Sequence, residues 1–164
     1  MIVKHFNLKN SFDKKIFLYL IYGQNFGLID EIINDILKPQ LPNNIFNYNE
    51  NEILSDPDKF EESLFNKSFF DNEKLIIINR STDKILNLVR NMVEKGLSDT
   101  SIIIKSGNLE KKSKLRNFFE KSKEAFCIPV YEDNHQTLNL ISRNYLNEKK
   151  IKISNESLNL VINR

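Results

Sequence analysis

The sequence predicts an α/β fold in which a parallel sheet is followed by a helical region. Short continuous apolar runs, typical of strands buried on both faces, alternate with segments whose apolar residues recur every three or four positions. The strand pattern stops near residue 134, and only helical patterns follow it. Alternation of this kind favours right-handed crossovers that cover both faces of one sheet. We therefore expect a sheet domain over residues 1–134 and the start of a second, helical domain over residues 135–164.

The N-terminal part of the sheet domain contains two expected strands. Residues 16–22 form the longest apolar run and end at a turn that begins with Gly23. Residues 28–37 show helical spacing, and Pro39 stops that helix soon afterwards. A shorter strand is expected at residues 45–48.

The remaining elements repeat this pattern. Helices are expected at residues 57–65, 84–95 and 109–123, and strands at residues 75–78, 101–104 and 126–131. Pro57 suits the first position of its helix, and Gly96 suits the position after the end of the next helix. In the helical region, Ser154 is the expected N-cap of the last helix.

The turn after the first strand is the place where a nucleotide-binding loop would lie in such a fold. Counting from Gly23, the positions for the second glycine, the lysine and the hydroxyl residue hold Leu28, Ile29 and Asp30. A carboxylate at the last of these positions would repel phosphate. The third strand is followed by Asn79 and Arg80 where an acidic metal ligand would be needed. The sequence thus indicates the architecture of a nucleotide-binding ATPase without its chemistry, and we expect no cofactor and no metal.

Composition argues against several other classes of protein. A net charge of +2 over 164 residues does not suit a chain that is basic throughout and binds nucleic acid by charge alone. Cys127 is the single cysteine, and its apolar neighbours predict a buried structural thiol. His5 and His135 have no partners at metal-ligand spacing. The apolar run at 16–22 is too short to span a bilayer, so we expect a cytoplasmic protein.

Four segments carry a resemblance to a known family. They are YLIYGQN at 19–25, SFFDNEKLIII at 68–78, KKSKLRNFFE at 111–120 and AFCIPVYED at 125–133. In this order they are similar to the YL-x-x-G, S-L-F-x-x-x-R-L-V-x-V, K-K-S-K-L-R-K-x-F-E and A-x-x-I-P-C-Y elements of the delta subunit of the bacterial DNA polymerase III clamp loader. The resemblance implies an AAA+-like domain, which is a P-loop-type fold with a degenerate phosphate loop, followed by a helical lid domain.

The resemblance also implies a function. Family members bind and open the sliding clamp during DNA replication and do not hydrolyse ATP themselves. It implies the clamp (the beta subunit) and the other clamp-loader subunits as partners, with DNA reached through the assembled complex. The expected role is therefore that of a non-catalytic component of the DNA-directed DNA polymerase holoenzyme.

The resemblance places the clamp-binding element at Ser68, Phe69 and Phe70, where Phe69 stands in the position of the family's leucine. Two adjacent rings before a strand have little core to enter, and each could contribute about 1.5–3 kcal/mol when a partner buries it. The literal S-L-F sequence lies upstream, so Leu64 and Phe65 are the alternative element. Four residues separate Phe70 from the apolar strand, as in the family, which favours the first assignment. Packing of both rings under the sheet is the structural alternative.

A basic segment offers possible contacts to DNA phosphates at Lys111, Lys112, Lys114 and Arg116. Three carboxylates lie close to it in the sequence, Glu110 directly before it and Glu120 and Glu124 after it. This pattern favours a solvated helix face crossed by salt bridges over a DNA-binding surface.

Two other functions are compatible with this fold class. A small α/β hydrolase or transferase would have its site at the C-terminal ends of the strands, near Gly23 and Asn79, and would depend on Asn25 or Asp30. A flavodoxin-like or receiver-like signalling module would need clustered acidic residues at the strand ends. Those positions hold Asn25, Asn79 and Arg80, which argues against such a module.

Overall fold

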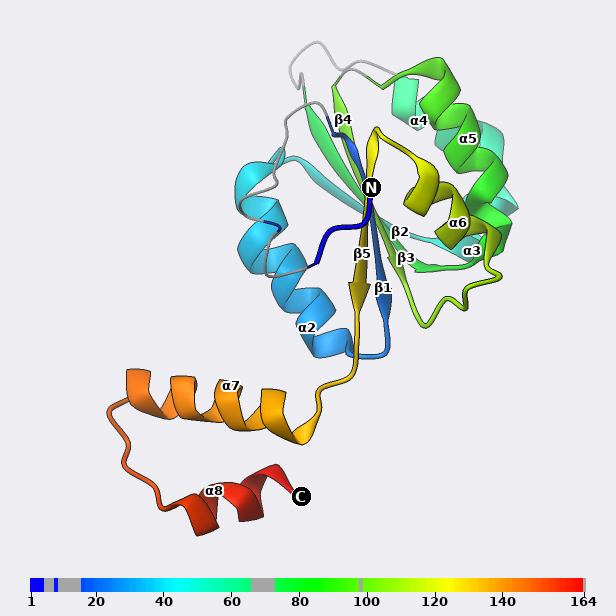
Figure 1. The fold of residues 1–164 in the computed structure, drawn as a ribbon. Coiled ribbons are helices and arrows are strands. Elements are labelled where there is room, and N and C mark those ends of the chain that lie inside the picture. The colour runs from blue at the N-terminus through cyan, green and yellow to red at the C-terminus, as the bar shows by residue number, and fades with distance from the viewer. Residues whose placement is uncertain (5–7, 9–15, 66–72, 98, 164) are drawn as a thin grey trace. The chain divides into compact units, whose positions relative to one another are not determined.

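The computed structural model describes residues 1–4, 8, 16–65, 73–97 and 99–163, and it divides the chain into two compact units, Met1–Val130 and Tyr131–Arg164. The first unit contains a sheet with helices on both faces (Figure 1). Its five strands are all parallel and lie in the order β2-β3-β4-β1-β5. Their bounds are β1 Leu18–Gly23, β2 Ile45–Asn49, β3 Lys74–Ser81, β4 Thr100–Ser106 and β5 Ala125–Val130. The order differs from the 2-1-3-4-5 order of flavodoxin-like sheets.

Alternating residues of the interior strand β1 contribute to two separate cores. Leu18 and Leu20 of β1 point into one apolar cluster, whereas Tyr19 and Ile21 point into the other. All six residues of β1 are buried, which explains why the sequence shows a continuous apolar run in place of an alternating one.

One face of the sheet is covered by the segment that follows β1. Helix α2 (Phe26–Glu31) continues as a π-helical stretch, Ile32–Leu37, and a 3-10 turn, Lys38–Gln40. The buried side chains of Ile29, Ile32 and Leu37 pack against this face. The expected helix at 28–37 is therefore present, but its second half is wound more widely than an α-helix.

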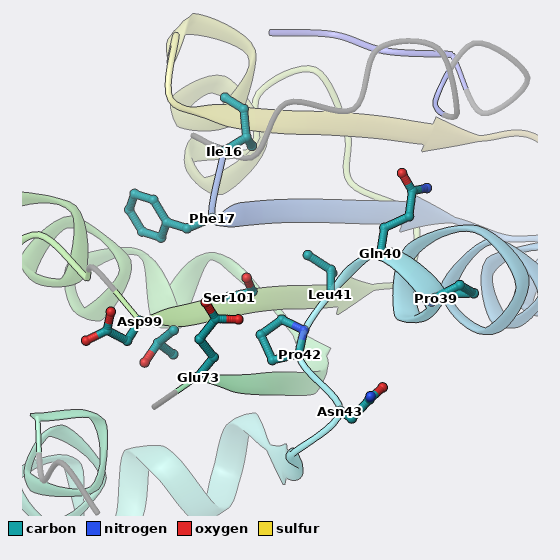
Figure 2. Close-up of a pocket in the computed structure, with 11 residues that line it drawn as sticks. Ile16, Phe17, Pro39, Gln40, Leu41, Pro42, Asn43, Glu73, Asp99 and Ser101 are labelled. Carbon is teal, nitrogen blue, oxygen red and sulfur yellow. The ribbon is translucent and has the colours of Figure 1, made fainter. Parts of the chain in front are cut away.

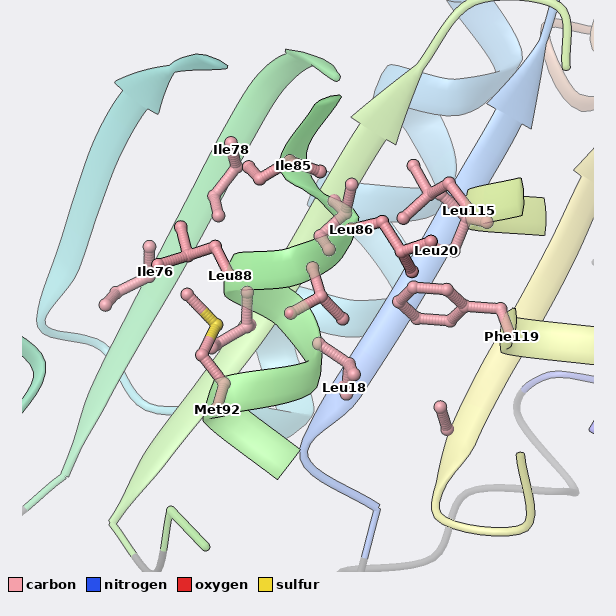
Figure 3. Packing of buried hydrophobic residues seen from close by; sticks show 14 of the residues in the cluster. Leu18, Leu20, Ile76, Ile78, Ile85, Leu86, Leu88, Met92, Leu115 and Phe119 are labelled. Carbon is pink, nitrogen blue, oxygen red and sulfur yellow. The ribbon is translucent and has the colours of Figure 1, made fainter. Parts of the chain in front are cut away.

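The opposite face is covered by four helices: α3 (Glu50–Ser55), α4 (Pro57–Phe65), α5 (Leu86–Lys95) and α6 (Lys114–Lys121). Figure 3 shows side chains of β1 and β3 meeting those of α5 and α6, with Leu20, Met92 and Phe119 among them. Helix α4 has the bounds that its sequence predicts, and α5 ends at Gly96, whose φ of 65° suits a residue without a Cβ.

Two helices differ from the prediction for local reasons. Helix α3 was not expected, because it is short and mostly polar: a capping box between Asn49 and Glu52 starts it, and Ile53 is its one buried apolar side chain. The helix expected at 109–123 was predicted too long, since α6 spans Lys114–Lys121 only. Ser113 is its N-cap and accepts a hydrogen bond from the Arg116 backbone at 3.2 Å, which fixes the start of the helix after the basic run has begun.

The second unit contains α7 (His135–Glu148) and α8 (Asn155–Ile162), which contact each other. Ser154 is the N-cap of α8, as predicted, and Leu158 is the buried residue of that helix. The boundary between the units falls after Val130, four residues before the expected one. Within the described residues, none of the helices has the length and apolar character that crossing a membrane requires.

Candidate functional site

The expected clamp-binding residues Ser68, Phe69 and Phe70 lie outside the residues that the structure describes. The alternative element is partly described. Leu64 is only 4% exposed and belongs to the core cluster under α4, together with Phe60. The side chain of Phe65 again lies outside the described part. Leu64 is thus already used by the fold and could reach a partner only if α4 left the core.

A cavity of about 490 Å³, open to solvent, lies at the N-terminal ends of the strands. Figure 2 shows side chains from four segments around it: Phe17 before β1, Leu41 and Pro42 before β2, Glu73 before β3 and Asp99 before β4. Residue 73 is also the first described residue after the expected clamp-binding element. The cavity and that element are therefore neighbours along the chain.

Backbone hydrogen bonds hold the walls of this cavity in place. The Lys74 amide donates to the Asp99 carbonyl at 3.0 Å, and the Ile102 amide donates to the Phe17 carbonyl at 2.7 Å. The Leu75 amide donates to the Asn44 carbonyl at 2.9 Å, which ties in the connection to β2. The cavity is thus formed by segments that the sheet itself positions.

The opposite edge of the sheet is where a nucleotide would bind in a fold of this kind. Gly23 ends β1 there with φ 152°, and its amide donates to the Gly107 carbonyl at 3.2 Å. A Cβ at this position would come within 1.7 Å of the Val130 carbonyl oxygen. Gly23 is therefore required for the close approach of β1 and β5, a role that needs no phosphate.

Polar groups in the residues after Gly23 have hydrogen-bond or ion-pair partners within the chain. The Asn25 side chain caps α2 by accepting from the Leu28 amide at 3.0 Å, so this donor is used within the chain. Asp30, at the hydroxyl position of a phosphate loop, pairs with Lys105 at the end of β4. One backbone donor of the turn is thus satisfied by Asn25, and the carboxylate at the hydroxyl position is paired with a lysine of β4.

A second cavity of about 610 Å³ opens at this edge, beside the ends of β3 and β4. Asn79 and Arg80 line it where an acidic metal ligand was missing from the sequence, and Asn79 donates to the Tyr48 carbonyl at 3.3 Å. Arg80 has φ 58° at a register irregularity of β3. In the described part of the chain, no group of three or more His, Cys, Asp or Glu residues could hold a metal ion. Among the described residues that line this cavity, the enzymatic alternative could use amides, hydroxyls, this guanidinium and the Lys105 ammonium.

The basic segment is largely paired within itself. Lys112 bridges to Glu110 at 2.9 Å, and the Arg116 Nε donates to Glu120 at 2.7 Å. Arg116 also donates to the Leu109 carbonyl at 3.1 Å and lies 5.3 Å from the Tyr22 ring centroid. The hydrogen bond to Glu120 raises the pKa of the guanidinium above its usual value. Of these two salt bridges only the one between Arg116 and Glu120 lies on α6, and the side chains of Lys111, Lys112 and Lys114 are exposed, so the interpretation of the whole segment as a salt-bridged helix face stays a prediction.

The single cysteine behaves as predicted. Cys127 is fully buried in β5, and burial raises the pKa of its thiol to about 12, with the nearby Glu120 carboxylate acting in the same direction. A thiol with so high a pKa carries almost no thiolate at neutral pH and is a poor nucleophile. It is therefore a structural residue.

The fold belongs to the AAA+-like class of α/β domains. In a comparison of structures, the chain is similar to the DNA clamp loader delta protein of Bacillus subtilis, with a TM-score of 0.63 and 15% identity over 95% of this chain and 50% of that chain. It is also similar to domain III of the replication initiation protein DnaA of Thermotoga maritima, with a TM-score of 0.51 and 17% identity over 96% of this chain and 72% of that chain. The chain thus spans half the length of the Bacillus protein.

The family follows from the sequence comparison. The model of the family described as DNA polymerase III, delta subunit, matches residues 19–129, which is more than half of the chain. A search of curated proteins gives no match. The chain belongs to the DNA polymerase III delta subunit family.

The cavity at the N-terminal edge was not predicted from the sequence. Its residues come from four connections that are far apart along the chain, and each connection looks like an ordinary loop when taken alone. The only sequence signal near it is the position of Glu73, three residues after Phe70.

Proposed function

We propose that this chain binds and opens the sliding clamp during DNA replication, as a clamp-loader subunit that hydrolyses no ATP itself. The observation that carries the proposal is the family match over residues 19–129, which includes both the degenerate phosphate loop and the expected clamp-binding element. The cap of α2 by Asn25 and the pairing of Asp30 with Lys105 support the part of the proposal that concerns ATP.

Ser68, Phe69 and Phe70 are the proposed clamp-binding residues. Burial of Leu64 in the core supports this choice over the upstream S-L-F sequence. Two adjacent aromatic side chains that enter a pocket of a partner are typical anchors of a protein interface, because they bury a large apolar area at a small cost in conformational entropy.

The proposed partners are the sliding clamp and the other subunits of the loader. DNA would be reached through the assembled complex, where Lys111, Lys112 and Lys114 are the exposed basic residues of the segment that also contains Arg116. We also propose that residues 1–134 act as the AAA+-like clamp-binding domain in the cytoplasm, and that residues 135–164 begin a helical lid domain.

Binding to the clamp of the same organism, measured by surface plasmon resonance, tests the proposal. The wild-type chain should bind, and the Phe69→Ala/Phe70→Ala variant should lose binding by at least about a hundredfold, since two buried anchors each contribute about 1.5–3 kcal/mol. Phe26→Ala is the matched control, because Phe26 is an exposed phenylalanine at the opposite edge of the sheet. Absence of wild-type binding would contradict the proposal.

The enzymatic alternative predicts a different result. A small α/β hydrolase or transferase would use the 610 Å³ cavity at the C-terminal edge, and its activity would fall on substitution of Asn25, which is next to the lining residue Phe26, or of Asp30, which pairs with the lining residue Lys105. ATP hydrolysis by the purified chain that disappears in Asn25→Ala would favour this alternative over the clamp-opening role.

A further inference from the structure

We propose that the cavity at the N-terminal edge of the sheet is a second contact surface for the sliding clamp, and that it receives a lysine or arginine side chain of the clamp. This inference rests on the proposed function, because it takes the clamp to be held by Phe69 and Phe70. It adds to that function a polar contact that fixes the orientation of the bound clamp.

The position of the cavity along the chain supports this partner. Phe70 precedes Glu73 by three residues. A partner that binds Phe70 therefore contacts a segment that is followed, three residues later in the sequence, by the cavity-lining residue Glu73.

The lining of the cavity suits a long basic side chain. Phe17, Leu41 and Pro42 provide apolar walls, and Glu73 and Asp99 provide carboxylates. Among the described residues that line the cavity there is no lysine or arginine. Lysine and arginine bury an apolar stem while their charged group stays near water, so one of them would contact both kinds of surface.

The cavity also needs little rearrangement to receive such a side chain. Its walls are joined by the backbone hydrogen bonds from Lys74 to Asp99 and from Ile102 to Phe17. Because these bonds exist in the free chain, binding does not have to order the walls, which lowers the entropic cost of the contact.

Two variants of the chain test the proposal by surface plasmon resonance with the clamp of the same organism. Glu73→Gln removes the charge and should weaken binding about two- to fivefold at low salt, with a smaller loss at high salt. Ser101→Leu places a larger side chain in the cavity without changing charge and should also weaken binding. Glu94→Gln is the matched control, because Glu94 is exposed on α5 and does not line the cavity.

The outcomes separate this inference from the proposed function. If the Phe69→Ala/Phe70→Ala variant loses binding while Glu73→Gln and Ser101→Leu both bind like the wild type at all salt concentrations, the second contact is overturned and the clamp-binding role stands. If the wild type does not bind the clamp, the proposed function and the second contact surface are both overturned. Weaker clamp binding by both variants, with an unchanged unfolding midpoint for each, supports the inference. Weaker self-association of these variants with unchanged clamp binding would instead assign the cavity to a second copy of the chain.

Discussion

The Asp83 carboxylate accepts a hydrogen bond from the Ser113 hydroxyl at 2.6 Å, and so joins the turn after β3 to the start of α6. The same carboxylate accepts from the backbone amides of Lys114 and Leu115, each at 3.0 Å. Asp83, from a distant segment, thus caps α6 together with Ser113, and these contacts explain why the helix begins at Lys114.

Asp83→Ala should therefore destabilise the fold by about 1 kcal/mol, as loss of a helix cap usually does. Burial raises the pKa of the Asp83 carboxyl, but its hydrogen bonds with Ser113, Leu115 and Lys114 outweigh burial, and the pKa lies below its usual value. The ionised Asp83 carboxylate therefore stabilises the folded chain at pH values above the pKa that it has in the unfolded chain. This contribution to the free energy of unfolding is lost as the pH falls through the lower pKa of the folded chain. Urea unfolding at pH 7 and near pH 3 measures this: the difference between wild type and Asp83→Asn should shrink at the lower pH. An unchanged difference would contradict the assignment.

Gly23→Ala should be among the most damaging small substitutions in the chain. The added Cβ would approach the Val130 carbonyl oxygen to 1.7 Å, and the backbone φ of 152° disfavours any residue with a side chain. We expect a loss of about 2–4 kcal/mol in the free energy of unfolding. Gly107→Ala is the control, because nothing lies within 4 Å of a Cβ there, and its unfolding midpoint should stay close to that of the wild type. Equal effects of the two substitutions would show that the approach of β1 to β5 is not the constraint.

The two S-L-F-like segments should respond differently to truncation. Leu64→Ala removes a side chain that is 4% exposed and should cost about 2–5 kcal/mol of stability. Phe69→Ala/Phe70→Ala should change stability by no more than about 0.5 kcal/mol if both rings await a partner. Chemical denaturation of the three proteins gives the comparison. A large loss of stability in the double variant would mean that the rings pack in the core and would contradict their proposed role.

The Cys127 thiol should be unreactive in the folded chain. Its raised pKa of about 12 leaves almost no thiolate at pH 8, and its burial in β5 denies access to a reagent. A chromogenic disulfide reagent should therefore modify it only at the rate of unfolding, and the rate should rise steeply in denaturant. Fast modification under native conditions would show that β5 opens readily.

Much of the fold could be predicted because the strands are buried on both faces. A continuous apolar run such as residues 75–78 leaves few other interpretations, and Pro57 and Ser154 mark helix starts through their own chemistry. Helix α3 and the late start of α6 could not be predicted in this way. They depend on polar contacts, Asn49 with Glu52 and Asp83 with Ser113, that hydrophobic periodicity does not record.

The features of the candidate sites also divide into those that the sequence predicts and those that depend on contacts between distant residues. The deficient phosphate loop was visible in the sequence, because each missing residue type has a fixed position after Gly23. The pairing of Asp30 with Lys105 was not visible, since 75 residues separate the two side chains. Likewise, the cavity that contains Glu73 and Asp99 exists only because parallel strands begin at a common edge of the sheet.

Release of the sliding clamp from circular DNA tests the central claim most directly. Clamp loaded on nicked circular DNA would be incubated with the purified chain without nucleotide, and the DNA-bound clamp would be separated by gel filtration. The account predicts that the wild-type chain speeds release in the absence of ATP, whereas Phe69→Ala/Phe70→Ala leaves release at its spontaneous rate. The clamp-opening role would be contradicted if release required ATP. It would also be contradicted if the double variant released the clamp as fast as the wild type.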